Sequence, residues 1–220
     1  LKLEKDMLFS DFITSSDKVY TIGTEVEATE VENGKNYFKN ILISISKNDG
    51  DFSIDTIKEL EVNKEKQYFF NDVITKGNYL YAVSAGWRDL DSLEKIYAGA
   101  IYRYDLVNAT SEFYTIEEIF PSDIYDIGDD FLAISHESIT IDKLGFTIFN
   151  YETLQSEFVD ISPYAISENE RIVDIKRLDL NHLLLLTENQ LIVYDILKGT
   201  ITLQLKCDDT LGTVFHIWIN

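Results

Sequence analysis

The stretch 181–205, NHLLLLTENQLIVYDILKGTITLQL, contains three apolar runs that are separated only by short polar segments. Its first run, 183–186, is four leucines without polar alternation, a pattern typical of a strand that is covered on both faces. The polar segments 187–190 and 198–199 predict tight turns between successive strands. With one more strand expected at 172–175, this part of the chain predicts a unit of four short strands.

The same order of elements recurs upstream. Three further segments each contain two consecutive hairpin patterns, and they are 11–57, 72–116 and 124–161. When the turns of the first hairpins are aligned at Lys18, Asn78, Asp130 and His182, the spacings are 60, 52 and 52 residues. An aromatic–acidic pair is expected to mark the end of the third strand in three units, namely Tyr104-Asp105, Tyr151-Glu152 and Tyr194-Asp195.

Repeats of this length, with four short strands and no sustained helix, are typical of propeller blades. A single twisted sheet of this kind leaves both faces uncovered, so neighbouring sheets must pack on it. On this pattern the sequence resembles the β-propeller superfamily, in the manner of WD-repeat scaffolds, over about residues 7–207. The Gly-His and Trp-Asp dipeptides of true WD repeats and the paired glycines of kelch repeats are absent, so the resemblance leads to no named family. It implies an all-β fold of four-stranded antiparallel blades.

We therefore expect a single propeller domain, or a propeller fragment, over residues 1–220. About four blades fit the chain, either as a closed ring or as part of a larger one, and the start at Leu1 together with an overhanging last strand favours the larger ring. The best candidate for a helix is 91–98, where Asp91 or Ser92 could cap the first turn. The expected blades are 7–60, 66–117, 122–162 and 170–207, followed by 213–220 as a closing strand or the first strand of another blade.

The charge balance restricts the class of partner. The chain has 39 acidic and 19 basic side chains, for a net charge of -20, which opposes approach to phosphate backbones, so we expect no direct binding to nucleic acid. Its apolar runs are far shorter than the roughly 20 residues that span a bilayer. Cys207 is the only cysteine, so no internal disulfide can form, which leans towards a reducing cytoplasmic or nuclear compartment.

Motifs for catalysis are missing from the sequence. There is no glycine-rich phosphate loop, dinucleotide fingerprint, Gly-x-Ser-x-Gly elbow or His-Glu-x-x-His helix. The histidines, His136, His182 and His216, are far apart in the sequence. We therefore expect no catalytic residue, no metal site and no cofactor.

Long acidic loops are the best candidates for recognition. The segments 24–36, 85–99 and 136–143 are enlarged and acidic, and in a propeller such loops open on one face. Trp87 and Arg88 have the residue types of interface anchors. Around them we expect six carboxylates to attract a basic partner by electrostatic steering: Glu25, Glu27, Glu30, Glu32, Asp89 and Asp91. The alternative, in which Trp87 folds back onto its blade and the carboxylates are only solvated, stays open.

These patterns predict a non-enzymatic propeller scaffold that binds a protein or peptide, preferably a basic one, through its acidic loop face. The scaffold could also be completed by further blades of the same or another chain. A second hypothesis is a lactonase- or glycosidase-like propeller hydrolase, with a metal or carboxylate site at the central channel formed by residues such as Asp72, Asp126 and Asp174. A third is a bacterial surface adhesin.

Overall fold

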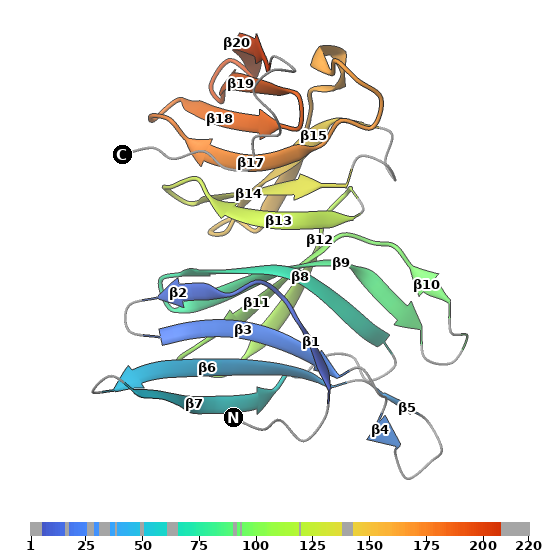
Figure 1. The fold of residues 1–220 in the computed structure, drawn as a ribbon, viewed down its shortest axis with the longest axis vertical. Helices are drawn as coiled ribbons and strands as arrows, with labels where there is room; N and C mark the ends of the chain where they lie inside the picture. Colours follow the sequence, from blue (N-terminus) through green and yellow to red (C-terminus); the bar gives the residue numbers. More distant parts are fainter. Residues whose placement is uncertain are drawn as a thin grey trace. The chain divides into compact units, whose positions relative to one another are not determined.

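The computed structural model describes residues 6–15, 18–25, 29–30, 36–37, 39–48, 51–60, 66–89, 92, 94–118, 120–137 and 143–207. These residues form antiparallel strands joined by turns, together with one short 3-10 helix, η1 (Ser162–Tyr164) (Figure 1). No helix among them is long and apolar enough to cross a membrane. The prediction of an all-β chain is therefore confirmed.

The N-terminal half of the chain forms two larger sheets and a separate two-stranded hairpin of β4 (Thr29–Glu30) and β5 (Asn36–Tyr37). The first runs in the order β1-β3-β6-β7, and β2 also pairs with β3. Its strands are β1 (Met7–Phe9), β2 (Ile13–Ser15), β3 (Lys18–Glu25), β6 (Asn40–Asn48) and β7 (Asp51–Glu59). The second runs β10-β9-β11-β12, with β8 on the other edge of β9. Its strands are β8 (Lys66–Lys76), β9 (Tyr79–Asp89), β10 (Lys95–Ile96), β11 (Ala100–Asp105) and β12 (Ser111–Thr115).

The third and fourth sheets are simple meanders of four strands each. The third contains β13 (Pro121–Asp126), β14 (Phe131–His136), β15 (Gly145–Asn150) and β16 (Gln155–Asp160). The fourth contains β17 (Ile172–Arg177), β18 (His182–Thr187), β19 (Gln190–Asp195) and β20 (Thr200–Lys206). Four consecutive antiparallel sheets of this kind are consistent with propeller blades, as the sequence predicts.

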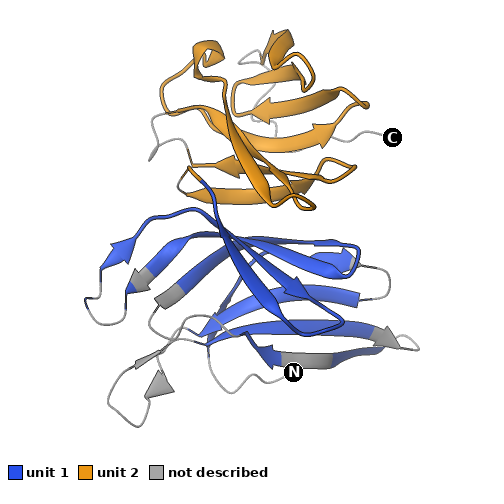
Figure 2. Ribbon diagram, turned by 180° about the vertical axis from the view of Figure 1, so that it is seen from behind, with its two compact units in different colours: residues 1–116 blue, residues 117–220 orange. Residues whose placement is uncertain are grey.

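The chain divides into two compact units, residues 1–116 and 117–220, and each contains two of the sheets (Figure 2). In the second unit, Leu183 and Leu185 of β18 pack against the third sheet in one hydrophobic core. Leu184 and Leu186 alternate with them and face the opposite side of the sheet, yet they are also buried. The unbroken leucine run is therefore covered on both faces, as expected.

One turn geometry recurs at the end of the third strand in three sheets. Asp105, Asn150 and Asp195 follow one another at intervals of 45 residues, and each side chain accepts backbone N–H bonds from residues two or three positions later. Four residues after each of them, the chain adopts a left-handed conformation, with φ of 59° at Ala109, 61° at Leu154 and 64° at Gly199. The sequence prediction that Tyr151-Glu152 marks this place in the third sheet is wrong. Phe149-Asn150 marks this place instead. The side chain of Asn150 is as short as that of aspartate, so its oxygen can accept hydrogen bonds from the backbone N–H groups two and three residues later.

The predicted helix at 91–98 is replaced by β10, which pairs with Trp87 and Arg88 of β9. Gly86 makes this possible, because it has φ of 137° and a Cβ atom there would lie only 2.2 Å from the carbonyl oxygen of Ile96. The backbone of β10 therefore passes so close to residue 86 that glycine is needed there. Asp91, Leu93 and the expected strand 213–220 lie outside the described residues.

Candidate functional site

Trp87 lies near the end of β9, just after an irregularity in the pairing of β8 with β9. It stands opposite Tyr68 in the sheet, and the two ring centroids are 5.9 Å apart. The indole also packs against the hydrophobic core of the first unit as a partly buried member. Burial in this aromatic cluster raises the pKa of the Tyr68 phenol.

A pocket of about 190 Å³ opens beside Trp87. Two of its residues, Ile96 and Tyr97, have exposed fractions of 39% and 50%, although both are large and apolar. The volume is below the roughly 300 Å³ at which sites for drug-sized ligands begin, so it suits a single apolar side chain. The residues that line it are Phe69, Ala85, Gly86, Trp87, Lys95, Ile96 and Tyr97.

Other predicted site residues have different surroundings. Arg88 belongs to β9, but its side chain lies outside the described part of the structure. Asp89 closes the turn after β9, because its carboxylate accepts hydrogen bonds from the backbone N–H of Ser92 at 2.8 Å and from the Ser92 hydroxyl at 3.1 Å. The structure thus brings Asp89 close to Trp87 along one strand but uses its carboxylate within the loop.

The structure describes only some of the predicted glutamates. Glu25 is the last residue of β3 and only 6% of it is exposed, so the expectation of a solvent-facing steering charge at this position is wrong. Glu30 lies in β4 and its side chain is not described, whereas Glu27, Glu32 and Asp91 lie outside the described residues. The acidic loop face therefore stays a prediction.

Sequence reasoning missed Phe69, Ile96 and Tyr97 as pocket residues. The adjacent pair Ile96-Tyr97 follows a charged loop, and this apolar pair could have signalled a wall of a recognition site. Its spacing instead predicts one face of a helix, which the described residues of 91–98 do not form. Phe69 carries no comparable signal, because an aromatic residue within a strand pattern more often belongs to the core.

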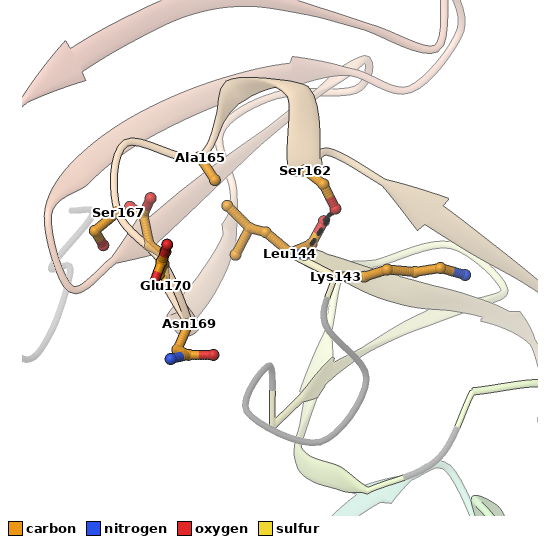
Figure 3. A pocket seen from close by; sticks show the side chains of 8 residues that line it. Lys143, Leu144, Ser162, Ala165, Ser167, Asn169 and Glu170 are labelled. Carbon is orange, nitrogen blue, oxygen red and sulfur yellow. Dashed lines mark hydrogen bonds between the residues drawn. The ribbon is translucent and has the colours of Figure 1, made fainter.

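The second unit has a pocket of about 200 Å³ between residues 143–144 and the loop before β17 (Figure 3). Glu170 in this loop is 2% exposed. Its carboxylate accepts hydrogen bonds from the Thr187 hydroxyl, from Gln190 Nε2 at 3.0 Å and from the backbone N–H of Ile166 at 2.8 Å. With these donors the buried charge is satisfied, so Glu170 fixes the loop to the turn between β18 and β19.

An aspartate recurs near the irregular part of the first strand in three sheets. Asp72, Asp123 and Asp174 follow at intervals of 51 residues. Asp72 and Asp174 come directly after the irregular part of their strands, whereas Asp123 lies within that of β13. The sequence singled out Asp126 for the third sheet, but Asp126 ends β13 and accepts a hydrogen bond from the backbone N–H of Gly128. Asp126 is three positions further along, where it pairs with Leu132, so Asp123 and not Asp126 continues the 51-residue spacing.

These aspartates make local contacts. Asp72 accepts a hydrogen bond from the backbone N–H of Val73 at 2.7 Å, and Asp123 accepts one from the buried hydroxyl of Ser135 at 3.0 Å. Asp174 lies 3.4 Å from Lys176 Nζ. Within the described residues, no group of three or more His, Cys, Asp or Glu side chains could hold a metal ion.

No protein-family model and no curated protein matches the sequence. Among solved structures, one variant of an apocarotenoid oxygenase from Synechocystis aligns with a TM-score of 0.54 and 9% identity, covering 92% of this chain and 51% of that protein. A second variant of the same oxygenase has a TM-score of 0.50 and 8% identity, covering 86% and 46%. A chain of a nidogen–laminin complex has a TM-score of 0.47 and 7% identity, covering 90% and 78%. The likeness to the oxygenase shows the fold alone, and the chain spans about half of its length.

In chemical terms, the two pockets differ. The pocket beside Trp87 offers apolar walls and one cation, Lys95, and it can exclude water from an inserted side chain. The pocket beside Glu170 has mainly polar walls whose best-placed groups are already hydrogen-bonded to each other, including Ser162 Oγ, which accepts from the backbone N–H of Leu144 at 2.9 Å. The Trp87 pocket is thus the better candidate for recognition.

Proposed function

We propose that this chain is a non-enzymatic propeller-like scaffold that binds a protein or peptide by taking one of its apolar side chains into the Trp87 pocket. The observation that carries the proposal is the pocket itself, an apolar cavity whose residues Ile96 and Tyr97 remain exposed. Burying such a side chain removes apolar surface from water on both partners, which is the main favourable term in association.

The partner is expected to carry basic residues beside its apolar anchor. The net charge of -20 creates a negative field that accelerates encounter with a basic segment. Glu94 is exposed in the loop next to the pocket, where it can contribute to that field. The same field disfavours nucleic acid, because phosphates are repelled.

A peptide library tests the proposal directly. Short peptides with one apolar residue between lysines or arginines are screened against the chain, and binding is followed by fluorescence of Trp87 in a Trp218→Phe background, since these are the only two tryptophans. We expect the emission of Trp87 to shift and the association rate to fall with rising salt. Peptides that bind without affecting Trp87 fluorescence would contradict the assignment of the pocket.

Variants at the rim separate recognition from folding. Ile96→Ser removes an exposed apolar wall and should weaken the selected peptide about tenfold without changing stability. Leu197→Ser is the matched control, because Leu197 is an even more exposed leucine in a turn of the second unit. Equal effects of both variants would indicate that the pocket is not the site.

A hydrolase is the second candidate, and the recurrence of Asp72, Asp123 and Asp174 is the observation that favours it. Aspartates such as Asp123 and Asp174, which recur in the first strands of both sheets of the second unit, can supply carboxylates for Ca²⁺ or for acid–base catalysis. A rise in melting temperature with Ca²⁺ that is lost in Asp123→Asn would support this candidate. No shift with any divalent cation would leave the scaffold as the preferred function.

A further inference from the structure

β20 is the outer strand of the fourth sheet, and it pairs on one side only, with β19 (Figure 1). No other described strand pairs with its outer edge. Such an edge presents unpaired backbone N–H and C=O groups that can accept another strand. The corresponding outer strands of the other three sheets are β7, β12 and β16.

Charge distinguishes β20 from the other three outer strands. Each of those carries carboxylates, which hinder edge-to-edge pairing: Asp51 and Glu59 in β7, Glu112 in β12, and Glu157 and Asp160 in β16. β20 has no acidic residue. It displays Leu203 and Leu205 instead, with exposed fractions of 44% and 52%. In a chain of net charge -20, β20 is thus the outer strand at which two copies meet the least local repulsion.

The direction of the free backbone groups follows from one hydrogen bond. The N–H of Cys207 donates to the carbonyl of Asn189, the residue before β19, at 2.7 Å. Because donors alternate along an antiparallel strand, Leu205 and Leu203 also face β19, whereas Gln204 and Lys206 face outward. Leu203 and Leu205 lie on the same face of the sheet, opposite Val193 and Leu191 in the register.

We propose that β20 pairs antiparallel with β20 of a second copy of this chain, about a two-fold axis at Gln204. This arrangement sets Leu203 of one copy opposite Leu205 of the other, so that two exposed apolar pairs cover each other and no carboxylate of the paired strands faces another. The self-complementary strand is what favours a second copy over an unrelated partner. One pair of short strands makes a small interface, so the dimer is weak and reversible.

Sedimentation equilibrium of the full chain tests the proposal. The mean mass should rise from 25.4 kDa towards twice that value as concentration increases from about 1 to about 100 µM. Added salt should favour the dimer by screening the repulsion between two copies of charge -20. Amide hydrogen exchange should show protection at Gln204 and Lys206 that increases with concentration. A chain that stays monomeric throughout the range overturns the proposal.

Two variants and their controls locate the interface. Lys206→Pro removes an outward N–H without breaking the pairing with β19, and it should raise the dissociation constant about tenfold, whereas Lys206→Ala should leave it unchanged. Leu203→Glu adds a carboxylate at the proposed contact and should abolish the dimer, whereas Leu197→Glu adds the same charge to an exposed turn and should not. A dimer that tolerates Lys206→Pro and Leu203→Glu refutes the assignment to β20.

Discussion

Arg177 of β17 joins the third and fourth sheets through Asp129: its Nη2 donates to Asp129 Oδ2 at 2.7 Å. The same guanidinium also donates to three carbonyl oxygens, those of Ile127, Asp179 and Leu180. Only one of these contacts is an ion pair. The set of Arg177 contacts, here called the Arg177 clamp, therefore mainly supplies hydrogen-bond donors to backbone carbonyl groups of the two sheets.

Arg177→Ala should therefore lower the free energy of unfolding of the second unit by about 2–4 kcal/mol, because carbonyl groups lose their donors as well as an ion pair. Urea unfolding measures this. Arg171→Ala is the control, since the Arg171 side chain is more exposed and its ion pairs within the described residues are with Glu188 and Glu137, and it should cost less than about 1 kcal/mol. Similar losses in the two variants would contradict the clamp.

Gly128→Ala should be coupled to Arg177. A Cβ atom at this position would lie 2.5 Å from Arg177 Nη1, and the backbone φ of 80° disfavours any side chain. In the Arg177→Ala background the clash with the guanidinium is absent, so Gly128→Ala should lower the free energy of unfolding less than it does in the original protein. The double variant should therefore be about 1 kcal/mol more stable than the sum of the two single effects predicts. A double-mutant cycle in urea measures the coupling, and strict additivity would show that the guanidinium simply moves aside.

Leu154→Gly should stabilise the protein by about 0.5–1 kcal/mol. Leu154 has φ of 61° and is partly exposed, so relief of the left-handed conformation outweighs the added freedom of the unfolded chain. Leu197→Gly, in the corresponding turn of the fourth sheet, lacks a positive φ and should destabilise the protein instead. Thermal unfolding distinguishes the two signs.

The loss of folding stability at acidic pH should depend on Lys198. Its Nζ lies 2.7 Å from Asp195 Oδ2, and this hydrogen bond is the largest of several contributions that lower the pKa of the Asp195 carboxyl. A carboxyl with a lowered native pKa adds stability above its unfolded pKa of about 4, and that stability is lost as the pH falls below it. Lys198→Gln should reduce stability at pH 7 and flatten its decline towards pH 2, as measured by urea unfolding across pH. An unchanged pH profile would mean that the ion pair contributes nothing.

The sequence predicts the sheets well because turn chemistry and burial are local signals. The Lys198-Gly199 pair predicts a turn, and Gly199 adopts φ of 64° there. Errors arise where a strand contains several candidates of one residue type, since β13 contains both Asp123 and Asp126 and only Asp123 keeps the 51-residue spacing to Asp72 and Asp174. The helix expected at 91–98 fails for a non-local reason, because the contact of Gly86 with β10 joins parts of the chain that its periodicity cannot relate.

For the candidate site, one residue carried most of the information. Trp87 was identified from its type and its loop, and it lines the apolar pocket. The burial of Glu25 could not be inferred. The sequence does not distinguish a glutamate that ends a buried strand from one that belongs to an exposed acidic loop. The proposed scaffold function also comes from the sequence, and the pocket is the observation on which we base the proposal that it binds one apolar side chain.

The turn shared by Asp105, Asn150 and Asp195 shows which part of its sequence is interchangeable. Three different residues, alanine, leucine and glycine, occupy its left-handed position, while the aromatic residue and the short acceptor before it stand at constant distances along the chain. The side-chain acceptor, and not a glycine at the bend, is therefore the element common to the three turns. An aromatic–acceptor pair that recurs every 45 residues marks these sheets in the sequence better than glycine positions do.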